Sequence, residues 1–113
     1  MSKVYIAQEP IYRDKDTGAV IPRFDLTPAA VYGELEFLTP GNANSLMPGP
    51  TMRALRQKLR GFSDEDFILP TGDPVLIAMV VLVAAESNMG KVKMLKWDKP
   101  TRSYIVIQLD TRS

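Results

Sequence analysis

The side chains best suited to recognise another molecule gather in the C-terminal part of the chain. Two aromatic residues stand among basic side chains, and the group consists of Trp97, Tyr104, Lys93, Lys96, Lys99 and Arg102. Aromatic rings with a polar tip anchor protein interfaces, and rings among basic groups also stack on nucleic-acid bases. A third interpretation is that the two rings cover a second hydrophobic layer of the fold. We predict that these six residues form a partner-binding surface.

A second basic group recurs at helical spacing. Arg53, Arg56 and Arg60, with Lys58 close by, share one side of a predicted helix, because residues three and four apart are neighbours on a helix surface. Guanidinium groups bind both phosphates and carboxylates in a bidentate manner. This basic helix face could therefore bind nucleic acid or an acidic protein surface. The alternative is a solvated face that pairs with the acidic residues 64–66.

Catalytic chemistry is restricted by two residue types that the chain lacks, cysteine and histidine. Without them there is no thiolate nucleophile, disulfide framework, cysteine–zinc site or imidazole relay. Carboxylate, lysine or tyrosine chemistry remains, as does a carboxylate-bound Mg²⁺ or Ca²⁺. We therefore expect a protein that is not an enzyme and that uses no cofactor.

The acidic residues have the spacing of structural caps. Asp64, Glu65 and Asp66 follow Ser63 directly, and this cluster lacks the spaced ligands and the glycine of a calcium loop. Asp73 precedes Pro74, as an N-cap residue precedes the first helical position. No metal site is expected from these residues, and the loop 39–50 contains no phosphate-binding glycine motif.

The formal net charge of +1 hides a strong segregation of charge. Residues 51–62 carry four basic side chains and no acidic one, and residues 91–102 carry five basic side chains against Asp98. Residues 63–90 carry five acidic side chains and no basic one. Such blocks create local fields that steer a charged partner, unless the fold interleaves them so that they neutralise each other.

The size and hydropathy of the chain predict one cytoplasmic domain. A length of 113 residues fits a single domain over 1–113. The most apolar stretch, 74–85, has twelve residues, whereas a membrane span needs about 20. The N-terminus lacks the apolar run of a secretory signal. The chain contains neither an internal repeat nor a low-complexity tract.

In the N-terminal half, alternating apolar residues and turn signals predict short elements. We expect a hairpin over 4–21 with a turn at 14–18, in which Gly18 takes a positive φ. A helical turn is expected at 28–32 with Thr27 as its N-cap. A strand over 34–38 should then direct Leu35 and Phe37 into the core.

Two longer helices are expected after the loop 39–50. The first, over 51–60, has a buried stripe of Met52, Leu55 and Leu59. The second runs over 74–88, and because its first twelve residues contain no polar side chain, it should be buried on all sides. One sheet cannot cover such a helix completely, so a contact with a second copy in a homodimer is predicted near it.

The C-terminal residues form the clearest hairpin, with strands over 91–97 and 103–109. Alternation places Val92 and Met94 together with Ile105, Ile107 and Leu109 on the core face. Leu95, Trp97 and Tyr104 then occupy the opposite face. The predicted fold is therefore α+β: a mostly antiparallel sheet with N- and C-terminal hairpins packed on the buried helix 74–88, with the amphipathic helix 51–60 beside it.

The C-terminal half resembles a family of small bacteriophage accessory proteins with no assigned activity. The resemblance rests on the segment 67–74, the Ala/Val-rich helix, the segment 90–98 and the strand that Tyr104 leads, and it covers about 25–110. It implies a phage context, expression in a bacterial host cytoplasm and an accessory role. It assigns a role to no individual residue.

Together these features predict a phage accessory protein that acts through protein–protein interaction, for example by modulating a host factor. Two alternatives remain open. One is a nucleic-acid-binding protein that uses the basic segments 51–62 and 91–102, and the other is a small structural protein of the virion.

Overall fold

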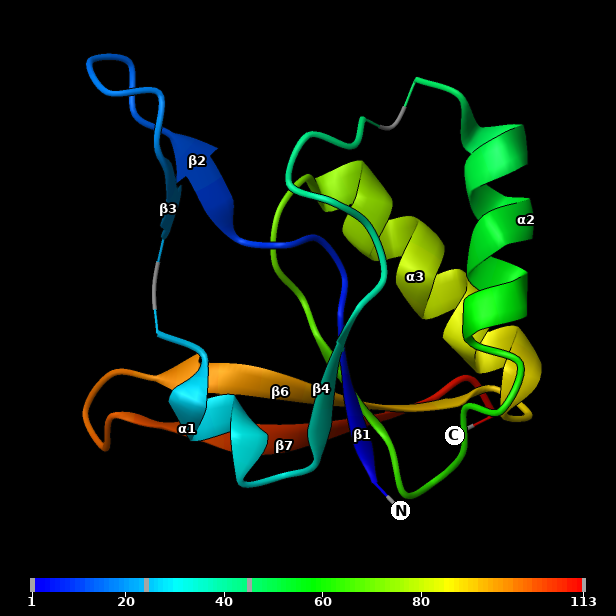
Figure 1. Ribbon diagram of the computed structural model, residues 1–113. Coiled ribbons are helices and arrows are strands. Elements are labelled where there is room, and N and C mark those ends of the chain that lie inside the picture. The colour runs from blue at the N-terminus through cyan, green and yellow to red at the C-terminus, as the bar shows by residue number, and fades with distance from the viewer. Residues whose placement is uncertain (1, 24, 45, 113) are drawn as a thin grey trace.

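The computed structural model describes residues 2–23, 25–44 and 46–112, and residue 45 of the predicted loop 39–50 lies outside this description. Its centre is a five-stranded sheet with the strand order β4-β1-β5-β6-β7. The strands are β1 (Lys3–Ile6), β4 (Glu34–Phe37), β5 (Phe67–Leu69), β6 (Lys91–Asp98) and β7 (Ser103–Asp110). Helices α2 and α3 cover one face of the sheet, and the short helix α1 covers the other (Figure 1).

The prediction of a mostly antiparallel sheet is wrong for this main sheet. Strand β1 pairs in parallel with both β4 and β5, and β5 pairs in parallel with β6. Only β6 and β7 are antiparallel. The reason lies in β1, where every residue from Val4 to Ile6 is buried, as is typical of an interior strand of a parallel sheet.

The N-terminal hairpin exists, but β1 is not part of it. Strands β2 (Ile11–Arg13) and β3 (Val20–Pro22) pair antiparallel in a separate two-stranded sheet. As predicted, the turn between them places Gly18 at a φ of 72°. Figure 1 shows this hairpin as an arm that projects beyond the main sheet.

The next two elements agree with the predictions only in part. Helix α1 (Thr27–Ala30) follows Leu26 as its N-cap, so Thr27 is not the cap. Strand β4 forms where expected, and Leu35 packs half-buried against the core under α1. Phe37 is exposed, because β4 lies at the edge of the sheet.

Helix α2 (Pro48–Lys58) begins three residues earlier than the predicted 51–60. Proline fits the first turn of a helix, where the N–H groups have no partner within the helix. The predicted stripe is present: Leu55 and Leu59 are fully buried and Met52 packs half-buried against the same core.

Helix α3 (Pro74–Ser87) begins as predicted, with the Asp73 carboxylate accepting the N–H of Val75 at 2.8 Å. Within one copy of the chain it is not buried on all sides, so the predicted cover by a second copy remains a prediction. Val75 and Leu82 are 51% and 59% exposed, because the sheet and α2 cover only one side of the helix.

The C-terminal hairpin has the predicted strands and the predicted division of side chains between its faces. Val92 lies opposite Leu109, and Trp97 lies opposite Tyr104. The burial differs from the prediction, since Ile105, Ile107 and Leu109 are 39–41% exposed rather than in the core. Strand β7 is the edge of the sheet, and α3 packs on this face mainly against β6.

Candidate functional site

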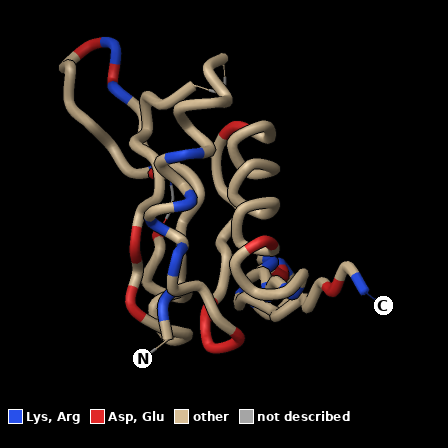
Figure 2. The backbone as a smooth tube through the Cα atoms, turned by 90° about the vertical axis from the view of Figure 1, so that its right-hand side faces the viewer, with Lys and Arg blue, Asp and Glu red and all other residues tan. Residues whose placement is uncertain are grey.

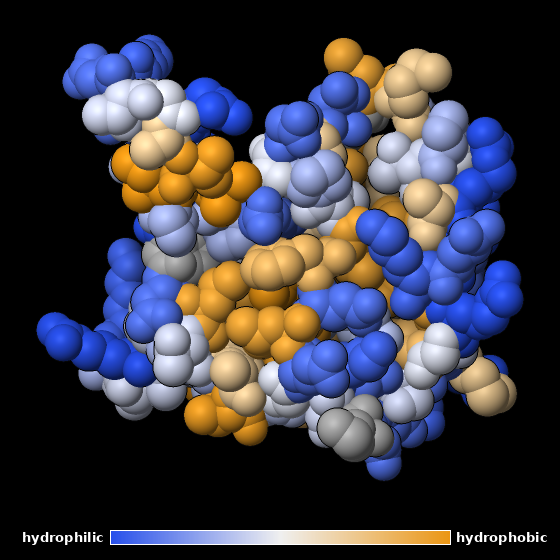
Figure 3. Space-filling view, in the orientation of Figure 1, coloured by the Kyte–Doolittle hydropathy of each residue, from blue (hydrophilic) through white to orange (hydrophobic). Residues whose placement is uncertain are grey.

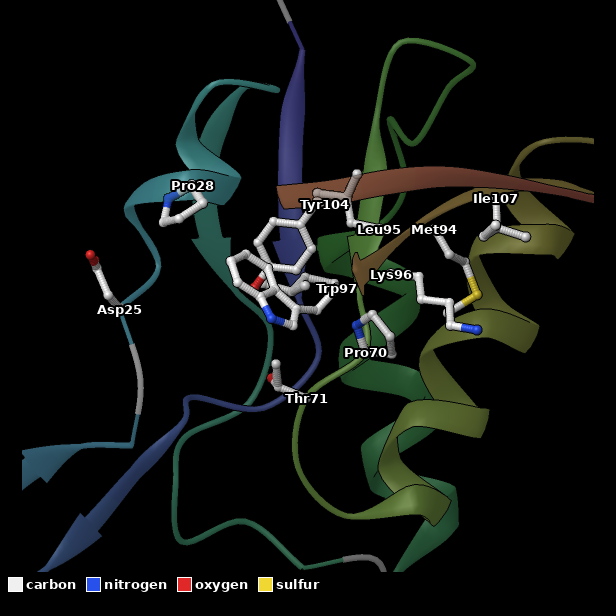
Figure 4. A pocket seen from close by; sticks show the side chains of 11 residues that line it. Asp25, Pro28, Pro70, Thr71, Met94, Leu95, Lys96, Trp97, Tyr104 and Ile107 are labelled. Atoms are coloured by element: carbon white, nitrogen blue, oxygen red, sulfur yellow. The ribbon is translucent and has the colours of Figure 1, made fainter. Parts of the chain in front are cut away.

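A cavity of about 860 Å³ opens where the parallel strand β5 ends and the β6–β7 hairpin continues (Figure 4). Its walls are mainly apolar, and the lining residues are Asp25, Pro28, Leu69, Pro70, Thr71, Met94, Leu95, Lys96, Trp97, Tyr104 and Ile107. Figure 3 shows hydrophobic side chains gathered at the centre of this side of the molecule, above the hairpin. The carboxyl ends of parallel strands are the usual place for a binding site in a sheet of this kind.

The cavity exists because two neighbouring strands differ in length. Strand β5 has three residues and shares only the register pair Ile68–Met94 with β6. Strand β6 continues to Asp98 beyond that pair, while Pro70 interrupts any further pairing on the side of β5. The free part of the hairpin therefore contributes residues from both of its faces, Leu95 and Trp97 from one and Met94 and Lys96 from the other.

Trp97 and Tyr104 form the aromatic wall of the cavity. They face each other across the hairpin, with ring centroids 5.0 Å apart and planes at 70°, an edge-to-face contact. The Tyr104 ring is nearly buried, whereas Trp97 is 41% exposed. Burial, with a smaller contribution from the Asp25 charge, raises the pKa of Tyr104. The phenol is therefore neutral near pH 7, and Trp97 is the ring that a ligand can reach.

A buried amide holds in place the segment with Pro70 and Thr71, which forms the base of the cavity. The Gln8 side chain donates to the carbonyl oxygens of Ala43 and Gly41 at 3.0 and 3.2 Å, and it accepts the N–H of Asp73 at 2.8 Å. The Thr71 hydroxyl, which lines the cavity, donates to the Gln8 carbonyl at 2.5 Å. These bonds tie the segments after β1, β4 and β5 to one another, so this base is preorganised.

The two charged groups of the cavity lie on opposite sides of it, as Figure 4 shows for Asp25 and Lys96. The Asp25 carboxylate accepts the hydroxyl of Thr27 at 2.6 Å and its N–H at 2.9 Å. These hydrogen bonds lower the pKa of Asp25. Asp25 is consequently an anion near pH 7, and Lys96 is a cation on the other side of an apolar space.

The six residues predicted to form one partner-binding surface are divided by the fold. Trp97, Tyr104 and Lys96 line the cavity. The Lys93 ammonium instead lies 4.4 Å from the centre of the Phe67 ring, a cation–π contact. Lys99 and Arg102 lie in the turn at the tip of the hairpin. Three of the six residues therefore line the cavity, and the other three lie outside its lining.

The predicted basic helix face lies on α2, which is on the other side of the molecule from α1. Figure 2 shows its basic positions running along one helix beside α3, whose acidic residues lie near its two ends. Arg56 pairs with Glu86 of α3 at 3.2 Å, and the Lys58 ammonium donates to the Leu38 carbonyl at 2.7 Å. Two residues of this basic group thus interact within the fold, whereas Arg53 and Arg60 are exposed.

The acidic cluster after α2 serves the fold. Asp66 is buried and accepts the backbone N–H groups of Lys3 and Ser63, each at 2.9 Å. Asp64 accepts the Asn88 side-chain amide at 2.9 Å. Within 2–23, 25–44 and 46–112, no group of three His, Cys, Asp or Glu residues is arranged to hold a metal ion.

Most of the cavity was missed by reasoning from the sequence. Asp25, Pro28, Leu69, Pro70 and Thr71 were not proposed as site residues, and neither were the apolar residues of the hairpin. One signal was available, because Pro70-Thr71-Gly72 directly follows a buried strand. That signal indicates a site only when β5 is known to be parallel to its neighbours.

Comparison with known proteins gives one match. Residues 2–111 match the model of a family described as Phage Pam3 gp32-like protein. No curated protein and no solved structure matches the chain. The resemblance to phage proteins predicted for about 25–110 is confirmed over nearly the whole chain. Among the residues that the structure describes, none of the helices has both the length and the apolar character needed to span a membrane.

Proposed function

The chain belongs to the Phage Pam3 gp32-like protein family, and from that premise we propose that it is a non-enzymatic phage protein that binds another protein through its cavity. The partner would insert an apolar segment between the Trp97–Tyr104 wall and the Pro70–Thr71 loop. This binding would take place in the cytoplasm of the bacterial host.

One observation carries the proposal: a preorganised apolar cavity leaves Trp97 41% exposed at its wall. The partly exposed indole lies within an apolar lining, and a partner that covered it would remove this contiguous apolar surface from water. Tryptophan in such a position is the residue type most enriched among the energetic anchors of protein interfaces. The surrounding Pro28, Leu69 and Ile107 offer apolar contact to the same ligand.

The polar groups of the cavity support binding rather than catalysis. Thr71 donates its hydroxyl hydrogen to the Gln8 carbonyl, and Asp25 receives two hydrogen bonds from Thr27. A nucleophile is normally activated by a general base within hydrogen-bond reach. The Thr27 hydroxyl and the Asp25 carboxylate are within that reach, but Thr27 does not line the cavity, and the hydrogen bonds that lower the pKa of Asp25 make its carboxylate a weaker base. The two separated charges are suited to orienting a polar or charged end of a bound segment.

The distribution of basic residues supports a protein partner over nucleic acid. Lysine and arginine side chains that track a phosphate backbone form a continuous groove. Here Lys96 is the basic residue that lines the cavity beside the aromatic pair, and the acidic residue Asp25 lines the same cavity. Phosphates entering this space would meet that negative charge.

The test is retention of a partner by the immobilised protein from a lysate of infected host cells. Trp97→Ala removes the exposed indole, and Tyr12→Ala is the matched control because Tyr12 is a 46% exposed aromatic on the projecting hairpin. We expect a protein that wild type and Tyr12→Ala retain and that Trp97→Ala loses. Equal retention by all three variants would contradict the proposal, provided that circular dichroism shows each variant to be folded.

Fluorescence gives a direct second measurement, since Trp97 is the only tryptophan. Adding the retained partner should shift its emission to shorter wavelength, because the indole leaves water. Titration with a single-stranded oligonucleotide at low salt should leave the emission unchanged. Oligonucleotide binding that weakens steeply with salt would instead favour the nucleic-acid alternative.

The origin of the partner decides between the two protein-binding roles. A retained protein that is also present in uninfected lysate would be a host factor. An antibody signal for this chain in purified virions, with a retained protein encoded by the phage, would instead identify a structural protein of the particle.

A further inference from the structure

Strand β7 presents an outer edge whose backbone groups can be assigned individually. The N–H of Thr111 donates to the Gly90 carbonyl at 2.9 Å, so the odd-numbered residues of β7 bond to β6. In an antiparallel pair the intervening residues direct their N–H and C=O groups to the other side. Consistent with this, the outward carbonyl of Tyr104 accepts the Tyr32 hydroxyl at 2.8 Å. Val106 and Gln108 therefore direct their backbone groups to the free edge.

Beyond Tyr104, whose outward carbonyl already accepts the Tyr32 hydroxyl, this edge lacks the features that keep an edge strand from pairing. Natural edges are usually short or carry charge, proline or a bulge. From Ser103 to Leu109, β7 contains no charged residue, no proline and no glycine. Its register with β6 continues without a bulge over all eight residues. Its apolar side chains are also accessible, since Ile105, Val106, Ile107 and Leu109 are 39–43% exposed.

We propose that β7 pairs antiparallel with β7 of a second copy of this chain, so that one sheet continues through the dimer. The two-fold axis passes at Val106, where each copy exchanges two hydrogen bonds with the partner's Val106. Tyr104 then lies opposite the partner's Gln108. This surface differs from α3, near which a dimer contact was predicted from the sequence.

The register is set by β7 itself, because the basic residues beside it lie outside the strand. Arg102 belongs to the hairpin turn, where its φ is 52°, and Arg112 follows the last residue of β7.

The apolar side chains also match in this register. Ile105 lies opposite the partner's Ile107, on the same face of the continued sheet. Because Ile107 lines the cavity, the partner's Ile105 would lie beside it and extend the apolar wall. Each cavity would then have a neighbouring residue from the second copy. This dimer does not depend on the proposed binding function.

The test is the solution mass of the full chain by light scattering over a range of concentrations. Wild type should have the mass of a dimer. Val106→Lys places two ammonium groups opposite each other at the axis, and Val106→Glu places two carboxylates there. Each variant should raise the dimer dissociation constant by about tenfold or more. An equimolar mixture of the two variants should restore the dimer, because Lys then lies opposite Glu.

Two lysine substitutions serve as controls. Val20→Lys changes a 53% exposed valine on the projecting hairpin and should leave the mass unchanged. Leu82→Lys tests the exposed side of α3. A wild-type monomer at all concentrations would overturn the proposal, as would a dimer lost in Leu82→Lys but kept in Val106→Lys. Failure of the mixture to restore the dimer, with both variants folded by circular dichroism, would overturn the register at Val106.

Discussion

The two edges of the main sheet, β4 and β7, are built in opposite ways. Strand β4 has four residues and carries Glu34 and Glu36, of which Glu36 pairs with Lys3 on the neighbouring strand at 3.4 Å. Strand β7 has eight residues and no charge from Ser103 to Leu109. Charge and shortness protect an edge from further pairing. Strand β4 therefore carries these protections, whereas β7 lacks them beyond Tyr104, whose carbonyl accepts the Tyr32 hydroxyl.

The two edges are also held to the sheet by different interactions. Strand β7 pairs with β6 over its whole length, and the Trp97–Tyr104 contact joins the two strands. Strand β4 shares four register pairs with β1, beside the exposed Lys3–Glu36 ion pair. The edge strand β7 is therefore held to the sheet by a longer and more apolar pairing than the edge strand β4. The following predictions test this comparison, from the largest effect to the smallest.

The largest loss of stability is expected on β6, the strand next to the β7 edge. Leu95 of β6 is 1% exposed, so Leu95→Ala should lower the free energy of unfolding by about 2–5 kcal/mol. Ile107→Ala on β7 should cost about 1 kcal/mol at low protein concentration, because that side chain is already half in water. Chemical denaturation measures both. Equal costs for the two variants at low concentration would show that β7 is covered within one copy and is not an open edge.

The aromatic attachment of β7 should give an intermediate effect. Trp97→Ala removes an edge-to-face contact worth about 0.5–1.5 kcal/mol together with part of its buried area. We expect a loss of about 1–2 kcal/mol in the free energy of unfolding, with the fold retained. Trp97→Phe keeps a ring opposite Tyr104 and should recover most of that loss. A full loss in Trp97→Phe would mean that the ring contact does not hold the hairpin.

Alkaline pH should weaken the β7 attachment through Tyr104. Burial raises the pKa of Tyr104 in the folded protein, while in the unfolded chain it is about 10. The unfolded state therefore loses its proton first, and stability falls as the pH rises above about 10. Tyr104→Phe should reduce this fall, as measured by unfolding at a series of pH values.

Tyr5→Phe provides the comparison at the centre of the sheet, because burial also raises the pKa of Tyr5. If neither substitution changes the dependence on pH, the alkaline loss arises elsewhere in the molecule.

The smallest effect should come from the protected edge. Glu36→Gln removes the exposed ion pair with Lys3, and such pairs contribute little to stability. The hydrogen bond and the charge of Glu36 raise the pKa of Lys3. We expect a smaller change in unfolding than in any variant above, absent in about 0.5 M salt. A large change that persists at high salt would contradict the view that charge on β4 mainly prevents pairing.

Local elements were predictable where the signal lies within a few residues. Helix α3 begins at Pro74 because Asp73 and Pro74 together start a helix, and β6 and β7 follow from two strand-like segments joined by a short turn. Strand β1 was assigned the wrong partner, since nothing near it in sequence indicates that β4 and β5 flank it. Alternation correctly assigned the side chains of β7 to the two faces of the sheet. It did not show that Ile105, Ile107 and Leu109 are exposed on theirs.

The candidate site was predictable only through its aromatic residues. Trp97, Tyr104 and Lys96 stood out by type, and all three line the cavity. Lys93 does not line the cavity, because its ammonium group lies over the ring of Phe67 on the neighbouring strand β5. Asp25 and Thr71 reach the cavity from segments far from the hairpin in sequence. The hydrogen bonds of the Gln8 side-chain amide join segments that are far apart in sequence, so no local sequence pattern indicates them.

The sequence alone determined the absence of histidine and cysteine chemistry, the main helices, the C-terminal hairpin and the resemblance to phage proteins. Capping, turn formation and side-chain periodicity act over a few residues, so each can be recognised locally. Only the tertiary structure decided which strands are parallel, where the cavity opens and which edge stays free. Those features depend on contacts between distant segments, because the pairing of a strand and the covering of a face are settled by what packs there.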